Sequence, residues 1–155
     1  MFRPMRRSEY CLGEQESLAL LGQGTHGTLA VLGDEGYPYA VPLNYAVADK
    51  RIFFHCALEG HKLDAIERES KVSFCAVLEE EIVPENFDTR FTSVVAFGGA
   101  RLLQKQDEIE FALRTLIRHL APDHIEPGED VIRRYEGKVG VVEIAIEHIT
   151  AKKGS

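Results

Sequence analysis

The fold class follows from residues 26–56, which read HGTLAVLGDEGYPYAVPLNYAVADKRIFFHC. Three runs in this stretch are rich in apolar, β-branched and aromatic residues: His26–Leu32, Tyr39–Ala48 and Arg51–Cys56. The short segments between them, Gly33–Gly36 and Asp49–Lys50, contain residues that form tight turns. The stretch therefore predicts three strands joined as antiparallel hairpins.

The rest of the chain adds strands and helices that do not alternate strictly. Further strands are expected at Lys71–Leu78, Phe91–Leu103 and Lys138–Ile149, with a polar loop at Glu79–Arg90. Helices are expected at Glu14–Leu21, Gly60–Arg68 and Asp107–Leu120, and a short polar helix after Pro127. Such a pattern favours a barrel over a doubly wound parallel sheet. We expect an α+β fold, a six-stranded antiparallel β-barrel with flanking helices, forming a single domain over residues 1–155.

Two of the predicted strands contain residues that disturb a regular ladder. Pro42 lies inside the second strand, and because proline has no N–H to donate, this strand should be at a sheet edge, bulged or interrupted there. Gly98 and Gly99 lie inside the fifth strand. Adjacent glycines in a strand mark a bulge or the close approach of another backbone.

The composition is that of a globular protein without a basic surface. Hydrophobic residues make up 45% and charged residues 28%, and 18 basic against 25 acidic residues give a net charge of −7. This charge argues against binding to nucleic acid or to acidic membranes. No apolar run is long enough to span a membrane, and no signal peptide is expected. Cys11, Cys56 and Cys75 are widely spaced, which predicts free, at least partly buried thiols and a cytoplasmic protein.

One familiar motif is present in the wrong context. Residues 22–27, GQGTHG, match the G-x-G-x-x-G pattern of dinucleotide binding, which needs a strand before it and a helix after it. Here the predicted helix comes first and the strand second, so we interpret these glycines as a helix end and a strand entry. His55 and His61, with Glu59 between them, are loosely spaced, and we expect no metal site.

The densest cluster of polar side chains follows an apolar strand, in residues 53–62, FFHCALEGHK. The strand ends near Cys56, the chain turns at Gly60, and a helix begins with His61 and Lys62 in its first turn. Free amides at a helix N-terminus attract a phosphate group, and two cationic side chains there strengthen the attraction. A solvated basic pair is the plain alternative.

Two other segments fit a flat aromatic ligand that carries a phosphate. In Tyr39–Tyr45 the ladder is disturbed at Pro42, which frees backbone groups to meet the polar edge of a heterocycle. Thr92 and Ser93 offer hydroxyl groups to a phosphate or a ribityl chain. Each segment also has an ordinary interpretation, as a bulged edge strand and as common strand residues.

Several segments occur together, in an order and at a spacing that are known from one family. They are Phe2–Arg3, Met5–Arg7, Gly27–Gly33, Gly36–Tyr45, Phe54–Ala57, Gly60–Ile66, Val72–Cys75, Phe91–Gly98 and Val142–Ile144. Over nearly the whole chain, the sequence resembles the pyridoxamine-phosphate-oxidase-like FMN-binding split barrels. Within that family it is similar to the nitroimidazole-resistance (Nim-type) proteins.

The resemblance implies a split barrel that forms a homodimer, with FMN in two equivalent clefts between the subunits. The backbone around the edge-strand proline would face the isoalloxazine ring: Val41, Pro42, Leu43 and Asn44. His61 and Lys62 would bind the phosphate, with Ser93 nearby. His55 is included in the cofactor-binding set. His61 also matches a histidine with a suspected direct role at the active site, and is therefore the candidate catalytic residue as well.

The resemblance thus predicts an FMN-dependent oxidoreductase that passes electrons from a nicotinamide donor to a small acceptor such as a nitroaromatic compound. A different class of function is a non-catalytic flavin- or haem-binding protein for storage or sensing, with His55 or His61 as an axial haem ligand. Oxidation of pyridoxamine phosphate is less favoured, because no distinct cluster of arginines is available for a substrate phosphate.

Overall fold

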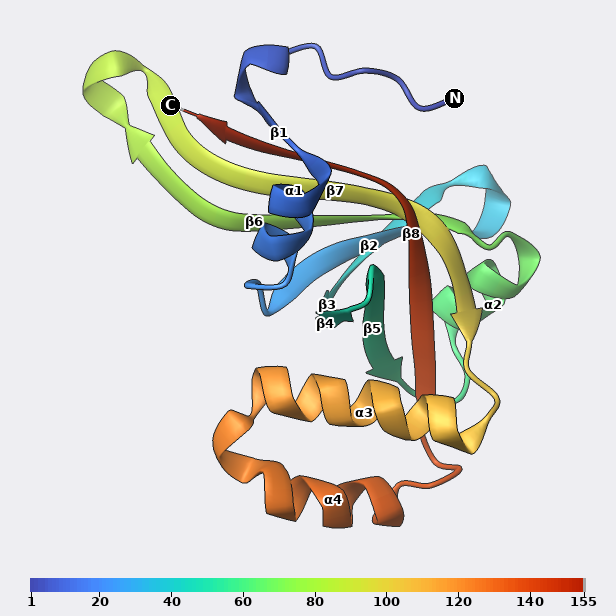
Figure 1. Cartoon of the computed structure of the whole chain (residues 1–155). Helices are drawn as coiled ribbons and strands as arrows, with labels where there is room; N and C mark the ends of the chain where they lie inside the picture. Colours follow the sequence, from blue (N-terminus) through green and yellow to red (C-terminus); the bar gives the residue numbers. More distant parts are fainter. Residues whose placement is uncertain (155) are drawn as a thin grey trace.

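A computed structural model describes residues 1–154 of the chain (Figure 1). The helices are α1 (Glu14–Leu21), α2 (His61–Arg68), α3 (Gln106–Leu120) and α4 (Ile125–Arg134). The strands are β1 (Cys11–Leu12), β2 (His26–Leu32), β3 (Pro38–Asn44), β4 (Ala46–Ala48), β5 (Arg51–Cys56), β6 (Lys71–Val83), β7 (Asp88–Leu102) and β8 (Gly140–Gly154). The predicted α+β class is confirmed, with four helices around an antiparallel sheet.

The described strands form one sheet whose two edges come from neighbouring parts of the chain. Its order is β3-β2-β6-β7-β8-β5-β4, and β1 pairs with β8. The edge strands β3 and β4 are separated in sequence only by Tyr45. The chain therefore joins the two edges of a sheet that curves into a barrel. The barrel is split between β3 and β4, because no backbone pairing is found between these two strands within residues 1–154.

The predicted strand Tyr39–Ala48 is divided into two, and the break lies at Tyr45 instead of Pro42. β3 is an edge strand, as expected from the missing N–H of Pro42. Tyr45 is fully buried, and its hydroxyl donates a hydrogen bond of 2.5 Å to the carbonyl oxygen of Leu21. Burial raises the pKa of Tyr45 to about 12. The chain changes from one sheet edge to the other where this side chain is anchored in the core.

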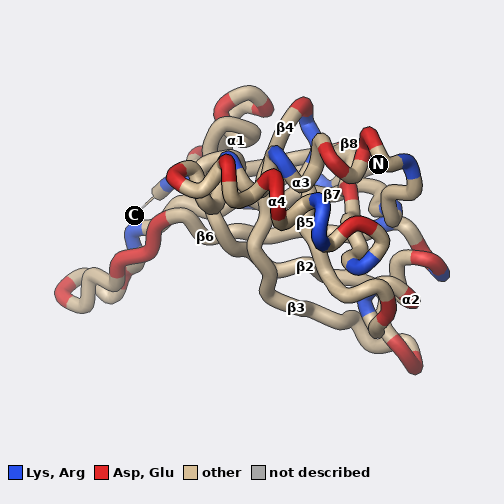
Figure 2. Tube along the Cα trace, turned by 90° about the horizontal axis from the view of Figure 1, so that it is seen from below, with Lys and Arg blue, Asp and Glu red and all other residues tan. Residues whose placement is uncertain are grey.

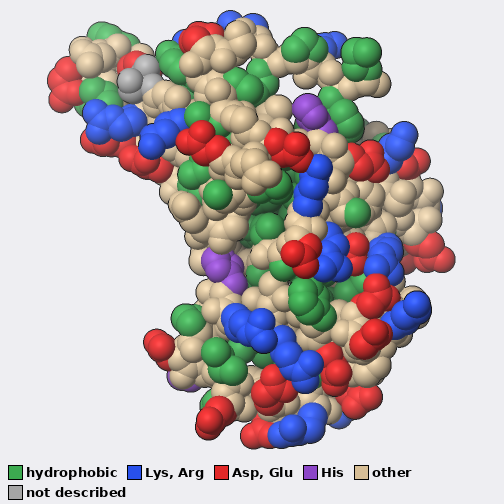
Figure 3. Space-filling model, in the orientation of Figure 1, with side chains coloured by type: hydrophobic (Ala, Val, Ile, Leu, Met, Phe, Trp, Pro, Cys, Tyr) green, Lys and Arg blue, Asp and Glu red, His purple; other side chains and the backbone are tan. Residues whose placement is uncertain are grey.

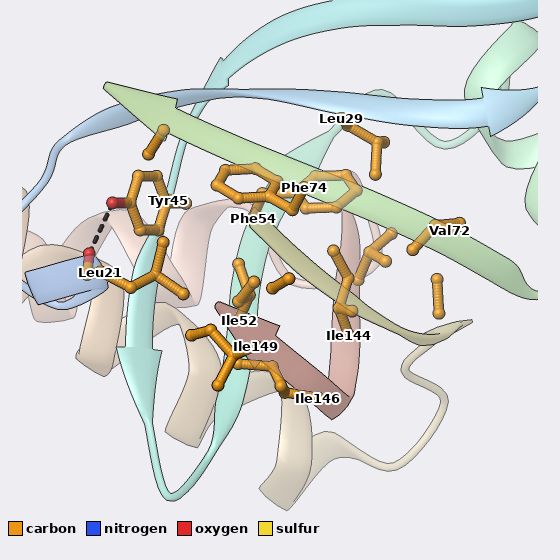
Figure 4. Close-up of a cluster of buried hydrophobic side chains, with 14 of the residues drawn as sticks. Leu21, Leu29, Tyr45, Ile52, Phe54, Val72, Phe74, Ile144, Ile146 and Ile149 are labelled. Carbon is orange, nitrogen blue, oxygen red and sulfur yellow. Dashed lines mark hydrogen bonds between the residues drawn. The ribbon is translucent and has the colours of Figure 1, made fainter. Parts of the chain in front are cut away.

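The main hydrophobic core lies inside the barrel (Figure 4). Alternate residues of the strands point inward, among them the nearly inaccessible Leu29, Phe54 and Phe74. A second cluster, which includes Phe53 and Leu116, lies between β5 and α3. Successive side chains of a strand face opposite sides of a sheet. β5 therefore contributes one set of side chains to the barrel and the other set to the helical layer.

β6 and β7 continue beyond the barrel as a two-stranded arm, where the sequence predicts a loop at Glu79–Arg90. The arm turns at Pro84–Asn86, and the side chains of Ile82 and Phe87 are 69% and 98% exposed. Figure 2 shows acidic residues along this projecting part of the chain. The loop prediction is wrong because it relied on polarity. In a hairpin that projects into solvent, both faces of the strands can be polar.

Of the three glycines in residues 22–27, Gly24 and Gly27 are required by packing. A Cβ atom on Gly27 would lie 2.5 Å from the ring of Phe74, and one on Gly24 would collide with the hydroxyl of Tyr45. α1 precedes these glycines and β2 follows them, as predicted. A dinucleotide-binding turn has the opposite order of elements.

Two of the three cysteines differ from the expectation in their exposure. Cys11, Cys56 and Cys75 are free, but Cys11 and Cys75 are exposed, contrary to the expected partial burial. In β6 the residues on either side of Cys75 face the barrel, so Cys75 itself faces outward. Within residues 1–154, no helix is long and apolar enough to cross a membrane. Figure 3 shows positive and negative side chains intermixed over the helical end of the molecule.

Candidate functional site

The N-terminus of α2 is open for a ligand. The first hydrogen bond of the helix runs from the amide of Asp64 to the carbonyl oxygen of Gly60, at 3.1 Å. The amides of His61, Lys62 and Leu63 therefore have no partner inside the helix. Gly60 has φ +148°, a conformation that side chains rarely permit, and so a glycine is needed where the chain enters the helix. This entry places two basic side chains beside three free donors.

Lys62 provides a cation without a carboxylate partner. Within residues 1–154 its ammonium group makes no ion pair or hydrogen bond. It lies close enough to the end of β5 to act on Cys56: burial raises the pKa of that thiol, and the positive charge of Lys62 opposes the rise. Lys62 is thus a free positive charge between the end of β5 and the first turn of α2.

His61 is held by the turn between β2 and β3. Its ring stacks on that of Tyr39 at a centroid distance of 4.1 Å. The backbone amide of Asp34 donates a hydrogen bond of 3.2 Å to Nε2 of His61. Asp34 also accepts a hydrogen bond of 2.9 Å from Nη1 of Arg68. The Arg68 guanidinium, and secondarily the charge of His61, hold the pKa of the Asp34 carboxyl below its usual range.

Nothing in the sequence indicates this support for His61. Residues 33–36 were interpretable only as a hairpin turn, and Asp34 is 27 residues from His61 along the chain. Arg68 is the last residue of an ordinary amphipathic helix. Only the packing of α2 against β2 brings Asp34 and Arg68 to the candidate site.

β3 lies next to this cluster and contains four of the predicted cofactor-binding residues. Val41 and Leu43 are partly buried and pack against the barrel core, whereas Pro42 and Asn44 are exposed. Asn44 donates a hydrogen bond of 2.9 Å to the carbonyl oxygen of Thr25. β3 pairs only with β2 among the described strands. Its second edge therefore offers backbone groups to a ligand, next to the residue, Tyr39, that stacks on His61.

On the outer surface of the sheet, two neighbouring rows of paired residues contain no Lys, Arg, Asp or Glu. One row of paired residues runs from β3 to β8: Pro42, Thr28, Cys75, Val95 and Thr150. The next row is Ala40, Ala30, Ser73, Phe97 and His148. We call these two rows the outer face. Figure 2 shows that β2 and β3 contain no Lys, Arg, Asp or Glu.

Ser93 lies beside the outer face but far from His61 in the same chain. It pairs with Val77 of β6 and with Lys152 of β8. The turn that holds His61 is level with the end of β6 where Lys71 pairs with Gly99. Ser93 is six residues from Gly99, which is about 20 Å along a strand. Within one chain, then, Ser93 does not join the cluster at α2.

His55 is separated from the other predicted residues by the sheet itself. Its neighbours in β5, Phe54 and Cys56, pack toward the barrel core, so His55 points to the opposite side. There it lines a largely apolar cavity of about 440 Å³ between α3 and α4, which also includes Leu116 and Tyr135. Within residues 1–154, His55 makes no hydrogen bond or ion pair. The structure thus brings together His61, Lys62 and β3, and places Ser93 and His55 elsewhere.

Comparison with known proteins adds a family to this geometry. The sequence model of the family "Pyridoxamine 5'-phosphate oxidase" matches residues 13–153, which is nearly the whole chain. The chain belongs to the pyridoxamine 5'-phosphate oxidase family. No curated protein matches its sequence.

Several solved structures with low sequence identity share the fold. A candidate 5-nitroimidazole antibiotic resistance protein from Bacteroides thetaiotaomicron has a TM-score of 0.76 at 21% identity, covering 92% of this chain and 86% of the other. An FAD-binding protein from Mesorhizobium loti has a TM-score of 0.68 at 24% identity, with coverages of 94% and 97%. An FAD- and haem-binding protein from Mycobacterium smegmatis has a TM-score of 0.77 at 15% identity, with coverages of 94% and 74%. The predicted split barrel is confirmed by these matches.

Proposed function

We propose that this member of the pyridoxamine 5'-phosphate oxidase family is an FMN-dependent oxidoreductase. The observation that carries the proposal is the N-terminus of α2, where unpaired amides, the free ammonium group of Lys62 and the ring of His61 meet. A phosphate dianion needs several converging donors and a positive charge, and this cluster has both. FMN fits the donor set because it ends in such a phosphate.

The same proposal gives β3 the role of orienting the flavin ring. The ring system has hydrogen-bond donors and acceptors along one edge, and the unpaired edge of β3 presents backbone groups of both kinds beside His61. Val41, Pro42, Leu43 and Asn44 are the residues at this position. Bound FMN would supply the redox chemistry, while the protein supplies binding, orientation and control of access.

A second copy of the chain is proposed to cover the outer face. Neighbouring rows without charged side chains on an exposed sheet surface are typical of a site where another protein binds. Facing copies would bury the row from Pro42 to Thr150 and the part of the second row from Ala40 to Ser73, whereas Phe97 and His148 already pack against Phe2 of the same chain. We propose that in such a dimer Ser93 of the partner subunit completes the flavin site, because Ser93 of the same chain is about 20 Å from that site along the strand.

The proposed activity is tested by loading the purified protein with micromolar FMN and removing unbound flavin. The expected result is a yellow protein that is bleached anaerobically by a nicotinamide donor and becomes yellow again with a 5-nitroimidazole acceptor. A protein that retains no FMN would overturn the proposal. Retention of FMN without reduction by either nicotinamide nucleotide would favour the non-catalytic alternative, storage or sensing of flavin.

The proposed dimer predicts the effect of a charge in the middle of the outer face. Val95→Glu should convert a particle of twice 17.4 kDa into one of 17.4 kDa, because a carboxylate cannot be buried there without a partner. Light scattering after size-exclusion chromatography measures the mass. Gln106→Glu, which makes the same change of charge at an exposed position on α3, is the control and should stay dimeric. A monomeric wild-type protein would contradict the prediction.

Haem is a second candidate ligand, favoured by the position of His55. An imidazole without a partner, at the wall of an apolar cavity of about 440 Å³, has the features of an axial ligand site. The M. smegmatis relative, which is described as binding FAD and haem, has the same fold. With haem added, we expect a Soret band that is lost in His55→Ala and kept in His61→Ala. Absence of the Soret band in the wild type, or its loss only in His61→Ala, would exclude this cavity as a haem-binding site.

A further inference from the structure

The two ring nitrogens of His61 have different surroundings. Nε2 is 3.2 Å from the backbone nitrogen of Asp34, in a geometry in which the amide donates. The nearest carboxylate oxygen of Asp34 is farther away, at 3.6 Å from the same nitrogen. Nδ1 is bonded to Cγ and so stays near the backbone of His61, where the first amides of α2 are unpaired. Each nitrogen thus has one set of groups within its reach.

A backbone amide can only donate, and this decides the protonation of the neutral ring. If Nε2 accepts the hydrogen bond from Asp34, it has no proton of its own. The single proton of the neutral imidazole must then be on Nδ1. Free histidine in water favours the opposite tautomer, with the proton on Nε2, so the turn at Asp34 selects the less common form.

Arg68 and the close packing at Gly33 hold the turn that makes this selection in place. Arg68 donates from Nη1 to the Asp34 carboxylate at 2.9 Å and from Nη2 to the carbonyl oxygen of Leu32 at 3.3 Å. The preceding residue, Gly33, leaves no room for a side chain: a Cβ atom there would lie 2.8 Å from the carbonyl oxygen of Tyr37 and 3.2 Å from Nε2 of His61. The stacking contact with Tyr39 fixes the plane of the His61 ring.

We propose that Asp34, braced by Arg68, is a positioning residue that fixes His61 as the Nδ1–H tautomer, so that His61 donates to a ligand phosphate and does not transfer a proton to reacting atoms. The inference rests on the proposed FMN site and decides between the two roles that the sequence leaves open for His61. A proton transfer through Nε2 would need the hydrogen bond from Asp34 to break. Donation from Nδ1 needs no change, and Nδ1 is the ring nitrogen nearer the backbone amides at the start of α2.

Two isosteric variants separate the roles of the two nitrogens. The side-chain nitrogen of asparagine takes nearly the position of histidine Nδ1, and that of glutamine nearly the position of Nε2. His61→Asn should therefore keep the FMN dissociation constant within about threefold, whereas His61→Gln should weaken binding about tenfold or more, as expected for a lost hydrogen bond to a charged group. The turnover number kcat is measured at saturating FMN in the same two variants. A large loss of kcat in both variants, with unchanged FMN affinity, would overturn the proposal and make His61 the proton donor.

A direct measurement of the tautomer does not depend on flavin. In ¹⁵N NMR spectra of the apoprotein, recorded at a pH where the His61 signal shows a neutral ring, Nδ1 should have the shift of a protonated nitrogen and Nε2 that of an acceptor. His61→Ala assigns the signals. A protonated Nε2 would overturn the inference even if FMN binds. An Nδ1–H tautomer in a protein that never binds FMN would keep the positioning role and overturn only the proposed function.

Discussion

Lys62→Ala is expected to weaken FMN binding by about 10- to 100-fold, the loss typical of a hydrogen bond between charged groups. Lys62 has no carboxylate partner within residues 1–154. No such partner would therefore weaken the attraction between its ammonium group and a phosphate at the N-terminus of α2. The dissociation constant is measured by quenching of flavin fluorescence. Since the interaction is electrostatic and close to solvent, the difference between the wild type and the variant should shrink as salt is raised.

Lys105→Ala is a matched control for this experiment. Lys105 is exposed and stands directly before the first turn of α3, so it is also a lysine at a helix N-terminus. Within residues 1–154 no histidine ring stacks at the start of α3, and the loss of Lys105 should leave FMN affinity unchanged. A second measurement needs no flavin: because Lys62 lowers the pKa of Cys56, Lys62→Ala should slow the alkylation of that thiol at neutral pH. Equal FMN affinity of wild type and Lys62→Ala would remove Lys62 from the site.

Gly98→Ala is expected to destabilise the barrel by about 3 kcal/mol, the upper part of the usual range for overpacking. A Cβ atom at Gly98 would overlap the carbonyl oxygen of Ala145 in the neighbouring strand β8. The overlap is with backbone, at a point where the pairing of β7 and β8 shifts its register. Neither strand can move without breaking its ladder. The free energy of unfolding is obtained from urea denaturation.

The adjacent glycine provides the control. A Cβ atom at Gly99 would be 3.9 Å from its nearest neighbour, Oε1 of Glu147, which is ordinary contact. Gly99→Ala should therefore change stability by less than about 1 kcal/mol, and its sign should favour alanine, which loses less conformational entropy on folding. The prediction also holds if Gly98→Ala does not accumulate as folded protein whereas Gly99→Ala does. Equal stability of the two variants would contradict it.

Features of the fold that depend on local chemistry could be predicted from the sequence. The bounds of α1, β2 and β5 agree with the expected ones, because apolar periodicity, turn residues and glycines define them within a few positions. The pair Gly98–Gly99 was expected to mark a bulge or a close approach, and both occur at Gly98.

Features that depend on distant contacts could not be predicted in this way. The strand break at Tyr45 is set by its burial and by its bond to Leu21, 24 residues away. The arm of β6 and β7 is formed by polar residues that resemble a loop. In the candidate site, His61 and Lys62 were found because they are adjacent at a helix start. Asp34 and Arg68, which hold His61, are joined to it only by tertiary structure.

The segment that links β3 to β4 through Tyr45 is also the part of the sheet at which aggregation would begin. Open sheet edges are templates on which another chain can add a strand. In this barrel the two ends of the sheet order belong to residues 38–48, so a misfolded neighbour would attach to the same short segment that is proposed to hold the flavin. A ligand bound along β3 would block the addition of another strand to that edge. The concentration of cofactor in the cell would therefore affect how much of the protein aggregates.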